Sequence, residues 1–401
     1  MAVAAVRGAD QSSPRAPSPS TREPHWDALR ALLMLLGIPF HATHPFRVGG
    51  GWMISSPDQS VPLTYVMHFL HLFRMHGFFV IAGYFAAMLL ARRDPAEWLR
   101  GRMTRLGIPL VFGLIVLVPI MHLGVALQSA PPGGVLASWA DQTLPPSRST
   151  TEHLWFLIVL IYYSALAAGL VMLMPGRRLV AIAPSLDRRI AGHAGLLLFL
   201  YAVATGCFTF LVGKMEGRVM AEDSFAADVL TLHFAWMYAP YFALGMIIQR
   251  TAGLRSAVTR WMWPLTVIGA GAAFVLLTRA SALPWALVCI LRAVAAIGLS
   301  QFLIAGVFAL FNRGHPWVKE VVDASFAIYL LHLPALVFLF WAVDGLPLPV
   351  TARFLLLTIG TLALCWAAWL VIRRHAVLQL LFSGLSPGAR TGSAPRPIPA
   401  R

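Results

Sequence analysis

The feature that most constrains the fold is a series of long apolar segments separated by polar or arginine-rich linkers. A bilayer core of about 30 Å requires roughly 20 helical residues. Hydrophobic residues make up 58% of the 401 residues and charged residues only 12%. We therefore predict an all-α, polytopic integral membrane protein with about ten transmembrane helices. The predicted spans are residues 28–46, 66–90, 106–128, 153–174, 194–212, 230–249, 262–278, 284–311, 323–343 and 351–372.

The basic residues support this count and orient the chain, because cytoplasmic linkers collect arginine and lysine. Most of the arginines fall in the two tails and in the even-numbered linkers. The odd-numbered linkers hold only Arg47, Arg148, Lys214, Arg218 and Arg279. This alternation predicts that both termini are cytoplasmic. The span 284–311 is long enough to be kinked or broken.

Composition also predicts the domain organisation and excludes some classes of protein. Residues 1–24 and 387–401 are expected to be disordered cytoplasmic tails around one transmembrane domain, residues 25–386. The net charge of +15 does not predict nucleic-acid binding, because the basic residues follow the topology rule. The three cysteines lie inside apolar segments without close-spaced partners, so neither a disulfide framework nor a metal site is expected.

The first span carries ionisable residues where a transmembrane helix rarely has them. Arg30 and His41 are eleven residues apart, which returns to within about 20° of one helix face, roughly 16 Å further along the axis. Pro39 should kink this helix just before His41. We expect the two side chains to point to the same side, Arg30 at the cytoplasmic edge and His41 near mid-bilayer. Arg30 could alternatively be a topology anchor paired with Asp27.

Other spans add polar residues at matching depths, and such residues usually face a bundle interior or a water-filled cavity. Topology places His41, His76 and His332 at middle depth, and His68 and His153 near the outer face. These positions predict a polar path across the bilayer. The alternative, a histidine that only hydrogen-bonds a neighbouring helix, stays open for His71, His76 and His332. The further polar residues of these spans are His44, Arg74, Glu152 and Arg292.

An ordered set of motifs resembles the acyltransferase 3 family of multi-pass membrane acyltransferases, and most closely the branch that modifies osmoregulated periplasmic glucans. The spacing of Arg30 and His41 resembles the signature of the family. Ala82 stands where the family often has serine. The other motifs are LLMLLGIPFH (32–41), FRMHGFFVIAGYF (73–85), RMTRLGIPL (102–110), HLWFLIVL (153–160), YFALG (241–245), DASFAIYLLHLP (323–334) and LFSG (381–384).

The resemblance implies an enzyme of the bacterial inner membrane. It would move a succinyl group from cytoplasmic succinyl-CoA, or another acyl-CoA, to hydroxyls of periplasmic glucans. The acyl-CoA is a substrate, and no permanently bound cofactor is expected. The expected partners are the glucan acceptor, the acyl-CoA donor, the lipid bilayer and the proteins of glucan synthesis.

Acyl transfer to a hydroxyl needs a base, and imidazole accepts protons near neutral pH. His41 is the predicted base, and Glu152 and His153 are its predicted catalytic neighbours. Arg30, Arg102 and Arg105 are expected to bind the donor, since guanidinium groups bind phosphate or carboxylate in bidentate fashion. The predicted cavity and acceptor residues are Trp52, His68, His76, Trp155, Arg292, Ser325, Tyr329 and His332.

Two alternative functions remain open. An O-acetyltransferase of another surface polysaccharide or lipid would keep the chemistry and change the substrates. A transporter would use the same histidines to line a passive path. For the acyltransferase, direct transfer and an acyl-enzyme intermediate are both open, although no G-x-S-x-G nucleophile motif is present.

Overall fold

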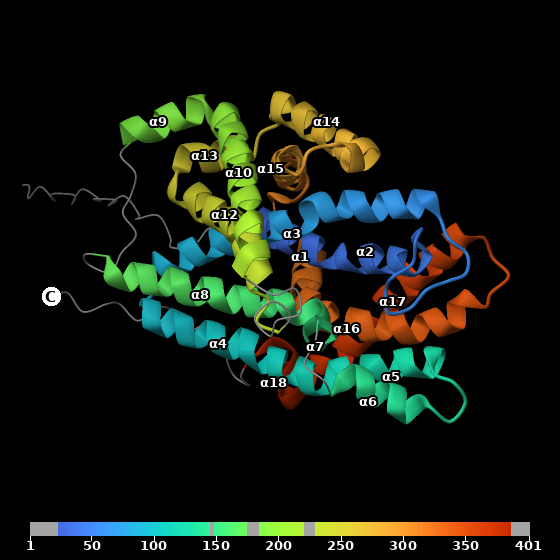
Figure 1. The fold of residues 1–401 in the computed structure, drawn as a ribbon. Helices are drawn as coiled ribbons and strands as arrows, with labels where there is room; N and C mark the ends of the chain where they lie inside the picture. The colour runs from blue at the N-terminus through green and yellow to red at the C-terminus, as the bar shows by residue number, and fades with distance from the viewer. Residues whose placement is uncertain (1–22, 145–147, 175–183, 220–228, 314, 386–401) are drawn as a thin grey trace, which may run out of the picture.

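The structure is a computed structural model that describes residues 23–144, 148–174, 184–219, 229–313 and 315–385, and every regular element within these ranges is helical (Figure 1). The elements are α1 (Pro24–Leu35), α2 (Gly37–Thr43), η1 (His44–Phe46), α3 (Val61–Leu90), α4 (Pro95–Phe112), η2 (Gly113–Leu117), α5 (Val118–Ser129), α6 (Val135–Thr143), α7 (Arg148–Thr151), η3 (Glu152–Leu154), α8 (Trp155–Leu173), α9 (Pro184–Gly192), α10 (Ala194–Val219), α12 (Leu232–Arg250), α13 (Ala252–Val258), α14 (Trp263–Arg279), η5 (Ala280–Ala282), α15 (Trp285–Phe311), α16 (Pro316–Asp344), α17 (Val350–Ile372) and α18 (Ala376–Ser383).

Each of the ten predicted spans coincides with a helical segment, which confirms an all-α polytopic membrane protein. Two of them, the broken segment α1–α2–η1 and helix α12, do not combine the length and apolar character that a single helix needs to cross a membrane. Eight described segments meet that criterion: Val61–Leu90, Pro95–Ser129, Glu152–Leu173, Ala194–Glu216, Trp263–Ala282, Trp285–Phe311, Pro316–Asp344 and Val350–Ile372.

The first span is interrupted where the sequence predicts a kink. α1 ends at Leu35 and α2 begins at Gly37. Pro39 explains the break, because its ring lacks an N–H and would collide with the carbonyl of Leu35 in a continuous helix. The long span 284–311 behaves differently, since α15 runs without interruption from Trp285 to Phe311.

The third predicted span is part of a longer helical segment that widens in the middle. Asp94 caps the start of α4 by accepting hydrogen bonds from the backbone N–H groups of Ala96 and Glu97. A π-helical turn, η2, then separates α4 from α5. Pro119 lies just beyond this turn and cannot donate to the carbonyl of Ile115, which favours the wider turn.

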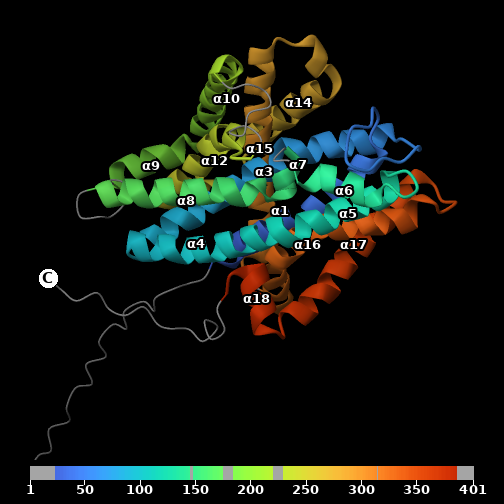
Figure 2. The same ribbon diagram turned by 60° about the horizontal axis from the view of Figure 1, so that its bottom comes forward.

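Helix α3 lies at the centre of the bundle and packs against α1, α8, α12 and α15 (Figure 2). Its contact with α12 is a backbone contact. A Cβ atom on Gly83 would lie 1.9 Å from the carbonyl oxygen of Phe242, and one on Gly245 would lie 1.8 Å from that of Val80. Only glycine fits at either position, which explains the glycines of the motifs at 73–85 and 241–245.

The two ends of the bundle carry different connections. The loop before α3, the α5–α6 turn and the α16–α17 connection lie together at one end, and the start of α4 and the end of α8 lie at the other (Figure 1). The grouping agrees with the predicted alternation of linkers, and the cytoplasmic placement of the termini stays a prediction. Of the predicted tails, residues 1–22 and 387–401 lie outside the described residues.

Candidate active site

Three histidines from distant parts of the chain meet at the break in the first span, and we call them the histidine cluster. The ring centre of His332 on α16 lies 5.2 Å from that of His41 on α2 and 5.2 Å from that of His153 in η3. His153 and His332 are buried, whereas His41 is partly exposed. The motifs at 32–41, 153–160 and 323–334 each supply one member, so their resemblance to the family converges on one place.

Backbone hydrogen bonds orient two of these rings. The Nδ1 atom of His332 donates to the carbonyl oxygen of Tyr329 (2.5 Å), and the Nε2 atom of His153 donates to that of Leu330 (3.3 Å). Each bonded nitrogen therefore carries the proton of a neutral ring, and the opposite nitrogen keeps a lone pair. Within the described part of the chain, His332 Nε2, His153 Nδ1 and His41 Nδ1 have no hydrogen-bond partner. The cluster can therefore accept a proton.

Arg74 on α3 brings a buried positive charge beside the histidine cluster. Its guanidinium carbon lies 4.5 Å from the ring centre of Phe40, and no carboxylate of the described residues forms an ion pair with it. A Cβ atom on Gly37 would lie 3.3 Å from Arg74 Nη1 and 3.7 Å from His332 Nε2. Gly37 thus leaves room for the cation and the imidazole to approach α2. The charge can stabilise an anion that forms next to the base.

Sequence reasoning noted Arg74 inside a span but did not select it as a site residue. The available signal was an arginine in an apolar helix, with histidines three residues before it and two residues after it.

A second part of the site is the arginine pocket, a cavity of about 270 Å³ lined by Arg30, Arg102 and Arg105 together with apolar residues, Ser325 and Asp323. The sequence placed the three arginines on the same side, and the structure brings them to one cavity. Arg30 pairs with Asp27 at 3.4 Å.

Arg102 lies near uncharged groups, the hydroxyl of Ser164 (3.5 Å) and the ring of Trp98 (6.0 Å). The cavity therefore carries an excess of positive charge.

The late motif LFSG explains how the pocket is closed on one side. Helix α18 ends at Ser383, and the residue that caps it, Gly384, has a φ of +59°. A Cβ atom there would lie 2.4 Å from the Cα atom of Arg105. Glycine both adopts the left-handed conformation and allows α18 to press against the helix that carries the arginines.

An aromatic layer separates the arginine pocket from the histidine cluster. Phe156 lines the pocket and its ring centre lies 5.6 Å from that of Tyr329. The Tyr329 ring lies 5.5 Å from His153 and 5.9 Å from His332. Its hydroxyl donates to the carbonyl of His153 (2.6 Å), and the Ser325 hydroxyl donates to that of Val322 (2.9 Å). Both hydroxyls are thus engaged with the backbone.

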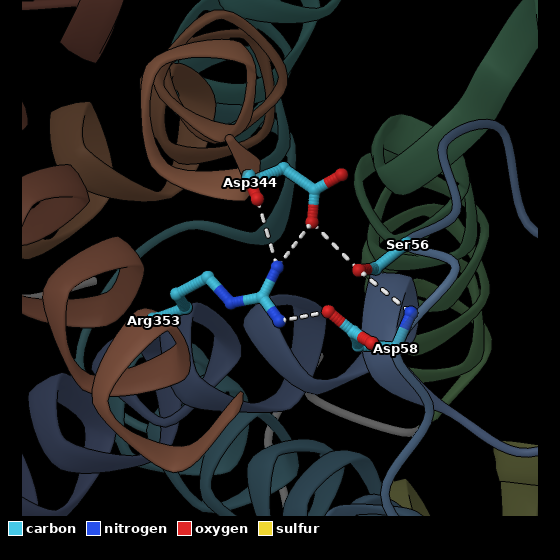
Figure 3. Close-up of polar contacts among 4 residues, drawn as sticks. All are labelled: Ser56, Asp58, Asp344 and Arg353. Carbon is cyan, nitrogen blue, oxygen red and sulfur yellow. Dashed lines mark hydrogen bonds and ion pairs between the residues drawn. The ribbon is translucent and has the colours of Figure 1, made fainter. Parts of the chain in front are cut away.

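On the other side of the histidine cluster lies the loop before α3, residues 47–60. Its Trp52 ring lies 5.0 Å from His44 and 6.1 Å from His41. Figure 3 shows how the loop is held, with the guanidinium of Arg353 bonded to both Asp344 and Asp58.

Arg353 is almost fully buried, at 5% exposed, and its Nη1 atom also donates to the Asp344 carbonyl oxygen (2.8 Å). Ser56 donates to the Asp344 carboxylate (2.6 Å) and accepts from the Asp58 N–H (3.2 Å). These bonds tie the second half of the loop that carries Trp52 to α16 and α17.

Five predicted site residues lie elsewhere. The carboxylate of Glu152 pairs with His122 on α5 at 3.6 Å, although its chain neighbour His153 belongs to the cluster. Trp155 stacks on Phe234 at 4.1 Å, so it is a packing residue here. His68 is exposed on α3.

His76, together with Arg292, lines a separate cavity of about 140 Å³ on another face of α3. Among the described residues, no group of three or more His, Cys, Asp or Glu side chains has an arrangement that could hold a metal ion.

Comparison with known proteins gives a consistent result. A family model described as an acyltransferase domain matches residues 24–370. The chain is 28% identical to "Glucans biosynthesis protein C" of Salmonella gallinarum over 92% of the chain and 96% of that protein. It is 27% identical to the protein of the same name from Salmonella typhimurium over 94% of the chain and 98% of that protein. No solved structure matches the chain.

Proposed function

The chain belongs to the acyltransferase 3 family, and from this premise we propose that it transfers a succinyl group from cytoplasmic succinyl-CoA to hydroxyls of osmoregulated periplasmic glucans. The family match and the apolar helices make it a membrane-bound acyltransferase. The names of its relatives favour a glucan as the acceptor. In this proposal the membrane is the bacterial inner membrane, and the product gains a negative charge with each succinyl group.

The observation that carries the proposal is the order of the site along the bundle. The arginine pocket, the Tyr329 layer, the histidine cluster and Trp52 follow one another from the end with the predicted cytoplasmic linkers to the opposite end. Arg102 and Arg105 fit the phosphates of the donor, because guanidinium groups bind phosphate in bidentate fashion. An acyl-CoA is larger than a 270 Å³ cavity, so only its phosphate-bearing part and the arm leading inward would occupy it.

The reaction that fits this order is a direct transfer. A glucan hydroxyl near Trp52 attacks the thioester carbonyl, and His41 removes its proton as the new C–O bond forms. The tetrahedral oxyanion lies beside the charge of Arg74, which lowers the barrier to its formation. The C–S bond then breaks, and the proton held by His41 passes to the departing thiolate. The ring of His332, which donates to the Tyr329 carbonyl, packs with its centre 5.2 Å from that of His41.

A direct transfer also agrees with the hydrogen bonding of the hydroxyls near the arginine pocket. An acyl-enzyme would need a nucleophile beside a base. Ser325 and Tyr329 instead donate their protons to backbone carbonyls. Neither is bonded to a ring nitrogen of the cluster.

The test is an assay of the purified full-length protein with succinyl-CoA and isolated periplasmic glucans, with the product mass as the readout. His41→Gln should lower the rate by about 100- to 10,000-fold, the range for loss of a general base. His68→Gln, an exposed histidine outside the cluster, is the matched control and should keep wild-type activity. Wild-type rates from a correctly folded His41→Gln protein would end the assignment of His41 as the base.

A further inference from the structure

The second cavity lies on a different face of α3 from the one that carries Arg74, and it is lined by both ionisable and aromatic side chains. It lies between α3, α10, α12 and α15, measures about 140 Å³ and is lined by His76, Glu216, His233, Trp236, Trp285 and Arg292 among others. His76 is 3% exposed, and within the described residues its Nδ1 atom has no hydrogen-bond partner. The catalytic sequence described above uses none of these side chains.

One side of the cavity is cationic. The guanidinium carbon of Arg292 lies 5.8 Å from the ring centre of Trp285, and no described carboxylate forms an ion pair with it. A partly buried guanidinium without a counter-ion is a binding site for an anion, and its fork of N–H donors matches a phosphate.

The cavity also has an acidic side. One carboxylate oxygen of Glu216 bonds His233 Nδ1 at 2.7 Å. The other, Oε1, is buried and accepts no hydrogen bond from any described residue. An oxygen in this state is suited to a cationic donor such as an ammonium group. The cavity therefore offers complementary groups for a ligand that carries both charges.

Position and size limit what this ligand is. Trp236 and Trp285 are about half exposed, at 52% and 48%, and Met215 is 64% exposed. In a membrane protein such surfaces face lipid, and tryptophans concentrate at the headgroup level. A cavity near 150 Å³ holds a group about the size of benzene. The entering part is therefore a small headgroup, and a glucan or a nucleotide is too large.

We propose that this cavity binds the headgroup of a zwitterionic phospholipid of the phosphoethanolamine type. Arg292 binds the phosphate, and Glu216 binds the ammonium group. The acyl chains remain in the bilayer beside Trp236 and Trp285. The proposal concerns lipid binding and does not depend on the acyl acceptor.

The experiment is native mass spectrometry of the purified full chain, titrated with phosphatidylethanolamine, with phosphatidylglycerol of the same acyl chains and with free phosphoethanolamine. Phosphatidylethanolamine should bind to one saturable site. Arg292→Gln and Glu216→Gln should each weaken this binding about tenfold or more, since a charged hydrogen bond is worth about 1.5–3 kcal/mol. The matched control is Arg279→Gln, an exposed arginine at the end of α14, which should bind as the wild type does.

The three ligands and the two variants distinguish the possible results. Phosphatidylglycerol should bind more weakly, and Glu216→Gln should not weaken it further. Equal binding of the two lipids would overturn the assignment of Glu216 to an ammonium group. Binding of free phosphoethanolamine as tight as that of the lipid would overturn the lipid as the ligand. Binding that neither variant changes, in proteins with wild-type thermal unfolding, would remove the site altogether.

Discussion

Arginine side chains lie at both ends of the bundle, but in opposite electrostatic surroundings. At the loop before α3, Arg353 is bonded to the carboxylates of Asp58 and Asp344 and is almost completely buried. In the arginine pocket, Arg30 pairs with Asp27, whereas Arg102 lies near a hydroxyl and an indole ring and Arg105 is exposed. The charge of Arg353 is neutralised by two carboxylates, and the pocket keeps positive charge in excess.

This difference separates two uses of the same residue type. A buried arginine that bonds two carboxylates can hold a loop in place, and removing it leaves two carboxylates without their counter-ion. Three arginines that share a cavity, of which Arg102 and Arg105 form no ion pair with a described carboxylate, repel one another, and a polyanionic ligand relieves that repulsion. We therefore assign a structural role to Arg353 and donor binding to Arg102. Variants of Arg353 should lower the midpoint of thermal unfolding, and variants of Arg102 should raise the KM for acyl-CoA.

The largest effect on stability is expected at Arg353. Arg353→Met should destabilise the fold by about 3 kcal/mol, near the lower end for a broken buried pair because Asp58 remains in contact with water. The measurement is the midpoint of thermal unfolding of the purified protein. Arg373→Met is the control, because the Arg373–Glu320 pair is largely exposed and should contribute at most about 1 kcal/mol. Equal midpoints for the two variants would remove the structural role of Arg353.

A smaller effect, on donor binding alone, is expected at Arg102. Arg102→Gln should raise the KM for acyl-CoA about tenfold or more, because a charged hydrogen bond to phosphate is worth about 1.5–3 kcal/mol. The midpoint of thermal unfolding should stay that of the wild type. Arg93→Gln, an exposed arginine of the same linker that does not line the pocket, serves as the control. An Arg102→Gln protein that unfolds at a lower temperature but keeps the wild-type KM for acyl-CoA would give Arg102 a structural role and contradict its assignment to donor binding.

The smallest effect is expected at Trp52, whose ring lies beside His44 and His41. Trp52→Ala should raise the KM for the glucan several-fold and leave the KM for acyl-CoA unchanged, since stacking on an aromatic ring contributes about 1 kcal/mol. Trp263→Ala, an exposed tryptophan at the start of α14, tests for general effects of losing an indole. A changed KM for acyl-CoA in Trp52→Ala would contradict the assignment of Trp52 to the glucan.

The sequence could predict features that depend on local pattern. Apolar length predicted the helices, and the alternation of linkers placed Arg30, Arg102 and Arg105 on one side. Pro39 predicted the break beside His41. These features follow from helix geometry and from the properties of the bilayer, which act on each segment separately.

The sequence could not predict which helix faces meet. Glu152 was expected to assist the base, yet it pairs with His122 because α5 lies beside η3. His76 and Arg74 are two residues apart on α3 and consequently lie on different faces of it, His76 lining the second cavity and Arg74 lying beside Phe40. Arg353 and Asp58 are separated by 295 residues, so no local pattern connects them. Such contacts depend on packing of the whole bundle.

The most direct test of the central claim is mass spectrometry of periplasmic glucans from cells with the gene deleted and with it restored. The account predicts that deletion removes a succinyl-sized mass increment from the glucans and that the intact gene restores it. Restoration with His41→Gln should leave the glucans unmodified. Identical glucans with and without the gene, in cells that synthesise them, would contradict the proposed acceptor.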